Sequence, residues 1–102
     1  MTDYDKEGFL IELDAWSPAV AEQLACASNV QLGREHWQVI HVLRAFYTRT
    51  EVSPAMRPFV KLVKDELGEE LGSSIALMQL FGESPAKMAA KIAGLPRPTN
   101  CL

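Results

Sequence analysis

Three Ser-Pro pairs divide the chain and constrain its fold more than any other feature. The pairs are Ser17-Pro18, Ser53-Pro54 and Ser84-Pro85. In each pair the serine is a good N-cap residue, and the proline suits the first turn of a helix. We therefore expect helices to begin at residues 18, 54 and 85, and to run to about 29, 67 and 93.

Apolar residues recur with helical spacing in and between these segments. Residues 34–49 read as the longest helix, with a broad apolar face, and residues 73–81 as a short one. Only the alternation over residues 8–13 is typical of a strand. The expected fold is mainly α (α+β): a compact helical bundle with a small N-terminal β element and an extended C-terminal arm.

Composition limits the setting in which this fold works. The 102 residues suffice for one domain, and the formal net charge of −3 argues against a protein that coats nucleic acid. No apolar run approaches the ~20 residues of a membrane span. The acidic N-terminus lacks the layout of a secretion signal. With two cysteines and no export signal, we expect a cytoplasmic protein with free thiols.

The C-terminus divides the chain into a body, residues 1–94, and an arm, residues 95–102. Gly94 is a natural helix cap, and Pro96 and Pro98 hold the following backbone extended. Cys101 lies near the tip, at most about 23 Å from Gly94 at ~3.3 Å per residue. Such a semi-rigid arm can carry a thiol into the active site of a partner.

Basic residues suggest two contact surfaces. Residues 84–102 hold Lys87, Lys91 and Arg97 but no acidic side chain, so partners are expected to contact the arm at Gly94, Leu95, Pro96, Arg97 and Pro98. Arg44 and Arg57, with Lys87 and Lys91, are candidates for an anion-binding or partner-binding surface. An ordinary solvated face fits Arg44 and Arg57 nearly as well, because acidic residues dilute the charge around them.

Several stretches together resemble the DsrC/TusE family of sulfur-relay proteins, from about residue 7 onward. The most specific is the tail, Lys91-Ile92-Ala93-Gly94-Leu95-Pro96-Arg97-Pro98 followed by Cys101. The others are GFL (8–10), DAWS (14–17), REHWQVI (34–40), LRAFY (43–47), PAMR (54–57) and LF (80–81). Each is weak alone, but their order along one chain is specific.

The resemblance implies that Cys101 carries sulfane sulfur as a persulfide. In the TusE branch, a TusBCD-like donor supplies the sulfur, which passes toward the enzyme that thiolates the wobble uridine of tRNA. In the DsrC branch, with DsrEFH-like donors and sulfite reductase as partner, a second cysteine lies 11 positions before the penultimate one. That position here is Ala90, so the chain is similar to the single-cysteine, TusE-like type.

Family members usually begin with a segment longer than the MTDYDKE of this chain, and that longer segment supplies another strand. The shortened N-terminus therefore predicts an exposed strand edge, covered by the body or by a second copy.

Other features support simpler interpretations. Cys26 is expected to be buried or half-buried as a small residue. His36 and His41 are five residues apart and face different sides of a helix, so we expect no metal site, and nothing indicates a cofactor.

A helix-turn-helix regulator stays an alternative for residues 54–81, although the segment SSIALMQLF lacks basic side chains and direct nucleic-acid binding is not expected. Docking to a sulfite-reductase-like enzyme without sulfur transfer is a further alternative.

Overall fold

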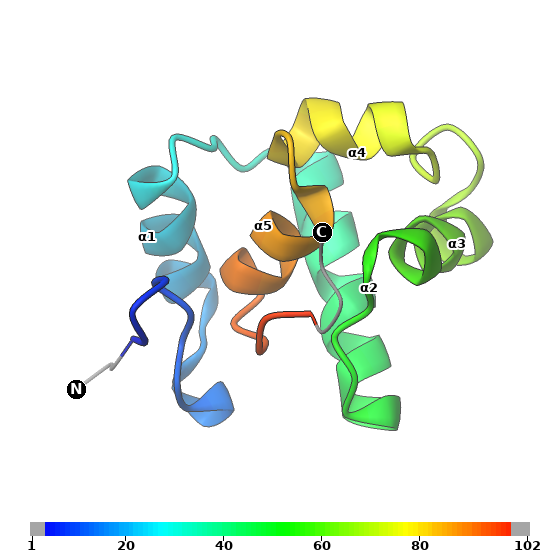
Figure 1. Cartoon of the computed structure of the whole chain (residues 1–102). Helices are drawn as coiled ribbons and strands as arrows, with labels where there is room; N and C mark the ends of the chain where they lie inside the picture. Colours follow the sequence, from blue (N-terminus) through cyan, green and yellow to red (C-terminus); the bar gives the residue numbers. More distant parts are fainter. Residues whose placement is uncertain (1–3, 99–102) are drawn as a thin grey trace.

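The helix at the centre of the fold is one of the two shortest α-helices described, with eight residues. The computed structural model describes residues 4–98, and in it helix α5 (Pro85–Ile92) contacts each of the four other α-helices (Figure 1). Its inward residues Ala86, Ala89 and Ala90 are at most 4% exposed. Because alanine side chains are small, neighbouring helices can approach α5 closely from several sides.

Most of the expected helices are confirmed. They are α1 (Pro18–Ala27), α2 (Arg34–Thr50), α3 (Met56–Leu67) and α4 (Ser74–Phe81), with a short 3-10 helix, η1 (Leu13–Ala15), before α1. Ser17 caps α1 by accepting a hydrogen bond from the Val20 N–H at 3.2 Å, and Ser73 caps α4 in the same way through Ala76 at 3.1 Å. The mainly helical fold class is therefore confirmed.

The second Ser-Pro pair does not start a helix, and this prediction was wrong. Helix α3 begins at Met56 with Ala55 as its N-cap, and the buried Ser53 hydroxyl has no hydrogen-bond partner in the described chain. Pro58 explains the later start. In a helix from Pro54, Pro58 would lack the N–H that bonds the Pro54 carbonyl, whereas in α3 it falls in the first turn, where no such bond is needed.

The expected strand over residues 8–13 is not confirmed either. Within residues 4–98, this segment holds one isolated antiparallel bridge, between Tyr4 and Leu10, and no regular strand. A turn takes its place: the Asp5 carboxylate accepts the N–H groups of Glu7 and Phe9, each at 2.9 Å. Phe9 and Leu10 are buried, so the turn is fixed against the helices rather than against another strand.

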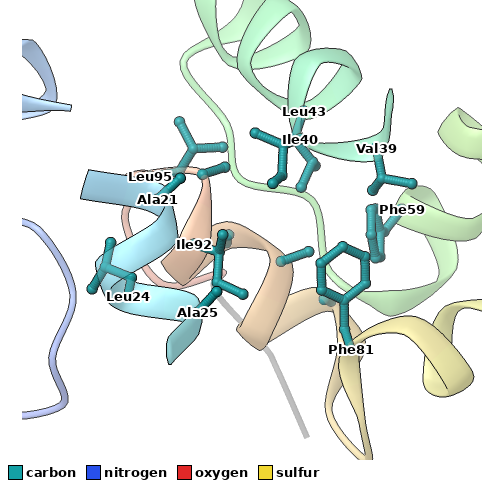
Figure 2. Close-up of a cluster of buried hydrophobic side chains, with 14 of the residues drawn as sticks. Ala21, Leu24, Ala25, Val39, Ile40, Leu43, Phe59, Phe81, Ile92 and Leu95 are labelled. Carbon is teal, nitrogen blue, oxygen red and sulfur yellow. The ribbon is translucent and has the colours of Figure 1, made fainter. Parts of the chain in front are cut away.

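The core lies between α1, α2 and α5 and extends toward α3 and α4. Figure 2 shows Ile92 of α5 between Ala21 and Ala25 of α1 on one side and Ile40 of α2 on the other, with Phe59 and Phe81 completing the cluster. Leu95, two residues beyond the C-cap Ala93 of α5, belongs to the same core and is 2% exposed. No helix among residues 4–98 is long and apolar enough to cross a membrane.

Candidate functional site

The candidate site is the junction at which α5 ends and the tail begins, and Gly94 is its pivot. Gly94 has φ +73°, a left-handed conformation that favours glycine. The Gly94 N–H bonds the Lys91 carbonyl at 3.1 Å, and the Leu95 N–H bonds the Ala90 carbonyl at 2.9 Å. This pair of bonds is a Schellman motif, which turns the chain sharply at the end of a helix.

Side chains from two distant segments complete this junction. The indole Nε1–H of Trp16 donates to the Ile92 carbonyl at 2.9 Å, and Nη1 of Arg44 donates to the Ala93 carbonyl at 2.6 Å. The guanidinium of Arg44 also stacks on the Trp16 ring, with its carbon 4.0 Å from the ring centre. We call Trp16 and Arg44, together with the carbonyls they hold, the tail clamp.

The tail clamp excludes water from part of a charged group. Burial lowers the pKa of the half-buried Arg44 below its ordinary value, because removal from water disfavours the charged form. Gly94 packs against the same indole so closely that an added Cβ would lie 2.3 Å from Trp16 Cδ1. The junction therefore requires a glycine, an indole and a guanidinium in contact.

Beyond the junction, the N-terminal turn meets the tail. Arg97 donates from Nη1 to Glu7 Oε1 at 2.6 Å, and Lys87 Nζ lies 3.9 Å from Glu7 Oε2. All three side chains keep about half of their surface exposed. Residues 84–98 contain no acidic side chain of their own. The carboxylate of Glu7, 90 positions before Arg97, therefore pairs with the cations of this segment.

Lys87 and Lys91 lie one helical turn apart on α5 and line a groove of about 780 Å³. The Lys91 amine lies 6.0 Å from the centre of the Phe9 ring. Met78, Met88 and other residues of mixed polarity form the remaining walls. This groove can accept a side chain or a short segment of another protein, although its charge is balanced in part by Glu7.

The other predicted site residues have different surroundings. Leu95 is in the core, Pro96 and Arg97 are exposed, and Pro98 is buried. Arg57 is exposed in the first turn of α3, whereas Arg44 is held in the tail clamp. Cys101 lies outside the described residues, so the division into body and arm stays a prediction.

Two residues near the site were missed at the level of sequence. Trp16 stands in the DAWS stretch, which marked the resemblance but gave no role to the indole. Glu7 carries no local signal, because its partners lie 80 and 90 positions further along the chain. Only the folded chain brings these side chains to the tail.

Cys26 and His36 lie away from the tail junction, and the structure shows the surroundings of each. Cys26 is exposed near the end of α1, so the prediction of a buried or half-buried thiol was wrong. His36 accepts the Gly33 N–H on Nδ1 at 3.1 Å, which leaves the protonated Nε2 to donate to the Leu80 carbonyl at 2.8 Å. His36 therefore ties α2 to α4. Residues 4–98 contain no cluster of three or more side chains suited to a metal ion.

Comparison with known proteins assigns this architecture to a class. The model of the family described as "DsrC like protein" matches residues 1–102, and the chain belongs to this family. Among characterised relatives, the sulfurtransferase TusE of Sodalis glossinidius is 49% identical over 98 residues, which cover 96% of this chain and 91% of the relative. TusE of Salmonella typhimurium is 45% identical, with coverage of 96% and 90%.

Solved structures give the same assignment. DsrC of Allochromatium vinosum superposes with a TM-score of 0.89 at 40% identity over 100% of both chains. The oxidised γ-subunit of dissimilatory sulfite reductase, DsrC, from Archaeoglobus fulgidus has a TM-score of 0.85 at 36% identity, with 99% and 92% of the chains covered. The resemblance noted from the sequence is thereby confirmed at the level of family and fold.

Proposed function

We propose that this protein is a sulfur carrier that takes sulfane sulfur on Cys101 and passes it to an acceptor enzyme in tRNA 2-thiouridine modification. The observation that carries the proposal is the similarity to TusE sulfurtransferases over 96% of the chain, at 41–49% identity over 98 residues. The donor is a TusBCD-like complex, and the acceptor is a tRNA-thiouridylase-type enzyme. The chain acts by transfer between proteins rather than by turnover of a small substrate.

The chemistry is an exchange of one sulfur atom. The Cys101 thiolate attacks the terminal sulfur of the donor persulfide, the donor S–S bond breaks, and the donor thiolate leaves. A new S–S bond forms on Cys101, the terminal sulfur keeps its proton, and no external oxidant or reductant is consumed. The acceptor thiolate repeats the same step on the Cys101 persulfide.

The tail fits this role in the features that the structure describes. Its root is fixed by the Schellman motif and the tail clamp, while Pro96 and Arg97 are exposed on the surface of the body. A fixed base with a short extended segment limits the conformational entropy lost when the thiol enters a partner.

A DsrC-like partnership with sulfite reductase or with sulfur-oxidation proteins is the second candidate. It is favoured by the solved relatives, which include DsrC subunits of dissimilatory sulfite reductase. Ala90 counts against the two-cysteine form of that chemistry, since this chain has no second thiol in the tail and its only other cysteine is Cys26. The helix-turn-helix alternative is also disfavoured, because the exposed residues of α4 are uncharged: Ser74, Ile75, Met78 and Gln79.

The test is sulfur loading followed by mass spectrometry. Wild type and Cys26→Ser are expected to gain one sulfur atom from a persulfidated TusBCD-type donor, and Cys101→Ser to gain none while folding normally. Incubation of loaded protein with a tRNA thiouridylase, and separately with sulfite reductase, then identifies the acceptor. Loading that persists in Cys101→Ser would refute the assignment of the carrier residue.

A further inference from the structure

The end of α5 is more completely hydrogen-bonded than a helix in water requires. The last four carbonyls of a helix have no partner within the helix and are ordinarily satisfied by water. Here the Ala90 and Lys91 carbonyls accept backbone N–H groups, and the Ile92 and Ala93 carbonyls accept Trp16 and Arg44. Three chain segments thus meet at one helix end.

This helix end is buried, which explains why protein donors rather than water satisfy its carbonyls: Ile92 and Ala93 are each 0% exposed. Arg44 is half-buried, and its lowered pKa reflects the loss of hydration around the guanidinium. Capping therefore accounts for the presence of two donors at this point. What the guanidinium and the indole add is direction, because both donors have planar groups held by their mutual stacking at 4.0 Å.

Direction at the root matters because Cys101 follows within a few residues of the last described one. Leu95 and Pro98 are buried against the body, and Cys101 is three residues beyond Pro98, at most about 10 Å at ~3.3 Å per residue. A rotation of the tail by about 10° would displace the end of an extended segment of that length by about 2 Å. Group transfer is sensitive to misplacement of the reacting atoms by about 1 Å.

We propose that Trp16 and Arg44 are positioning residues for sulfur transfer: by holding the Ile92 and Ala93 carbonyls, they set the direction in which the tail leaves the body. The proposal rests on the sulfur-carrier function above. It concerns delivery to a recessed protein acceptor and assigns no chemical step to either side chain. Loading of Cys101 itself by a small persulfide is expected to be unaffected.

The first test measures direction without a partner. Trp16→Phe keeps an aromatic ring but loses the indole N–H, and Arg44→Lys keeps the charge but loses the planar contact. Residual dipolar couplings of the Leu95 and Arg97 N–H groups, with wild type as reference, report the orientation of the tail root. We expect altered or reduced couplings in both variants, with the couplings of α1 and α3 unchanged.

The second test measures delivery. Protein loaded with sulfur is mixed with a tRNA thiouridylase, or with dithiothreitol as a small acceptor that needs no insertion. We expect transfer to the enzyme at saturating concentration to slow by about tenfold in each variant, and transfer to dithiothreitol to stay at the wild-type rate. Arg49→Lys is the matched control, because Arg49 also lies over a ring on α2, Phe46 at 5.6 Å, and makes no hydrogen bond to residues 94–98.

The outcomes separate the two proposals. A wild type that never loads sulfur refutes the carrier function, while the dipolar couplings still test whether the tail clamp sets direction. Unchanged couplings together with wild-type delivery in both variants would overturn the positioning role. Equal slowing toward both acceptors would also overturn it, because it would indicate a general loss of structure rather than of direction.

Discussion

Two separate factors disfavour a side chain at Gly94, and a comparison with Gly82 distinguishes them. Gly82 has a similar positive φ of +91°, but a Cβ added there would meet nothing within 4 Å. At Gly94 the same atom would meet the Trp16 ring at 2.3 Å. Both backbones disfavour a side chain, and Gly82, with φ +91° and ψ −161°, lies in the region less accessible to other residues. The steric contact with the indole is specific to Gly94.

We expect Gly82→Ala to lower the free energy of unfolding by about 1–3 kcal/mol through the backbone alone, and Gly94→Ala by about 2–3 kcal/mol or more. Urea denaturation followed by circular dichroism gives both values. In a Trp16→Ala background the cost of Gly94→Ala should fall to about 1 kcal/mol, whereas that of Gly82→Ala should not change. An unchanged cost of Gly94→Ala in that background would contradict the close packing of Gly94 on Trp16.

Glu7 illustrates how one exposed carboxylate changes the charge that a partner meets. Exposed ion pairs contribute little to stability but affect the rate of association. If partners recognise the cations of the tail, Glu7→Gln should speed association at low salt by leaving Arg97 and Lys87 unpaired, and Arg97→Glu should slow it. Stopped-flow measurement of partner binding at two salt concentrations checks this. Slowing in both variants would show that the Glu7–Arg97 contact itself is part of the binding surface.

At the scale of elements, the sequence predicted the helices well and their start signals unevenly. Ser17 and Ser73 cap helices through their side chains, but Ser84 makes no such bond and Ser53 is not a cap at all. Helix periodicity reflects burial of a whole face and is robust, whereas a cap depends on one local geometry. Pro58 prevents a helix that starts at Pro54, so Ser53 is not its N-cap. Both prolines are visible in the sequence, and their spacing could have indicated the later start.

The four serines make a graded prediction. Ser17→Ala and Ser73→Ala should each reduce the free energy of unfolding by about 1 kcal/mol, through loss of a cap hydrogen bond. Ser84→Ala should have little effect, and Ser53→Ala should be neutral or stabilising, because it removes a buried hydroxyl that has no partner among residues 4–98. Denaturant midpoints for the four variants decide. A loss at Ser53 as large as at Ser17 would mean that a bound water satisfies this hydroxyl.

At the scale of the whole molecule, the family was predictable from the sequence, but the surroundings of the tail were not. The motif from Lys91 to Pro98 indicated the location of the candidate site, and Gly94 indicated its turn. The clamp and the Glu7 contact depend on approaches between segments 49 to 90 positions apart. Such contacts are set by the packing of α1, α2 and the N-terminal turn around α5, which local patterns do not encode.

The two thiols give a prediction for the molecule as a whole. Because position 90 holds alanine, 1% exposed in the core, mild oxidation cannot form the tail disulfide of two-cysteine relatives. Since Cys26 is exposed, we expect intermolecular bridges through either cysteine. Cys26→Ser should yield dimers joined only through Cys101, and Cys101→Ser dimers joined only through Cys26. Peptide mass mapping after oxidation identifies the bridges, and the concentration dependence of dimer formation separates them from internal ones. A monomer closed by a Cys26–Cys101 bridge as the main product would instead show that the tail reaches the exposed end of α1, and would make Cys26 a candidate resolving thiol.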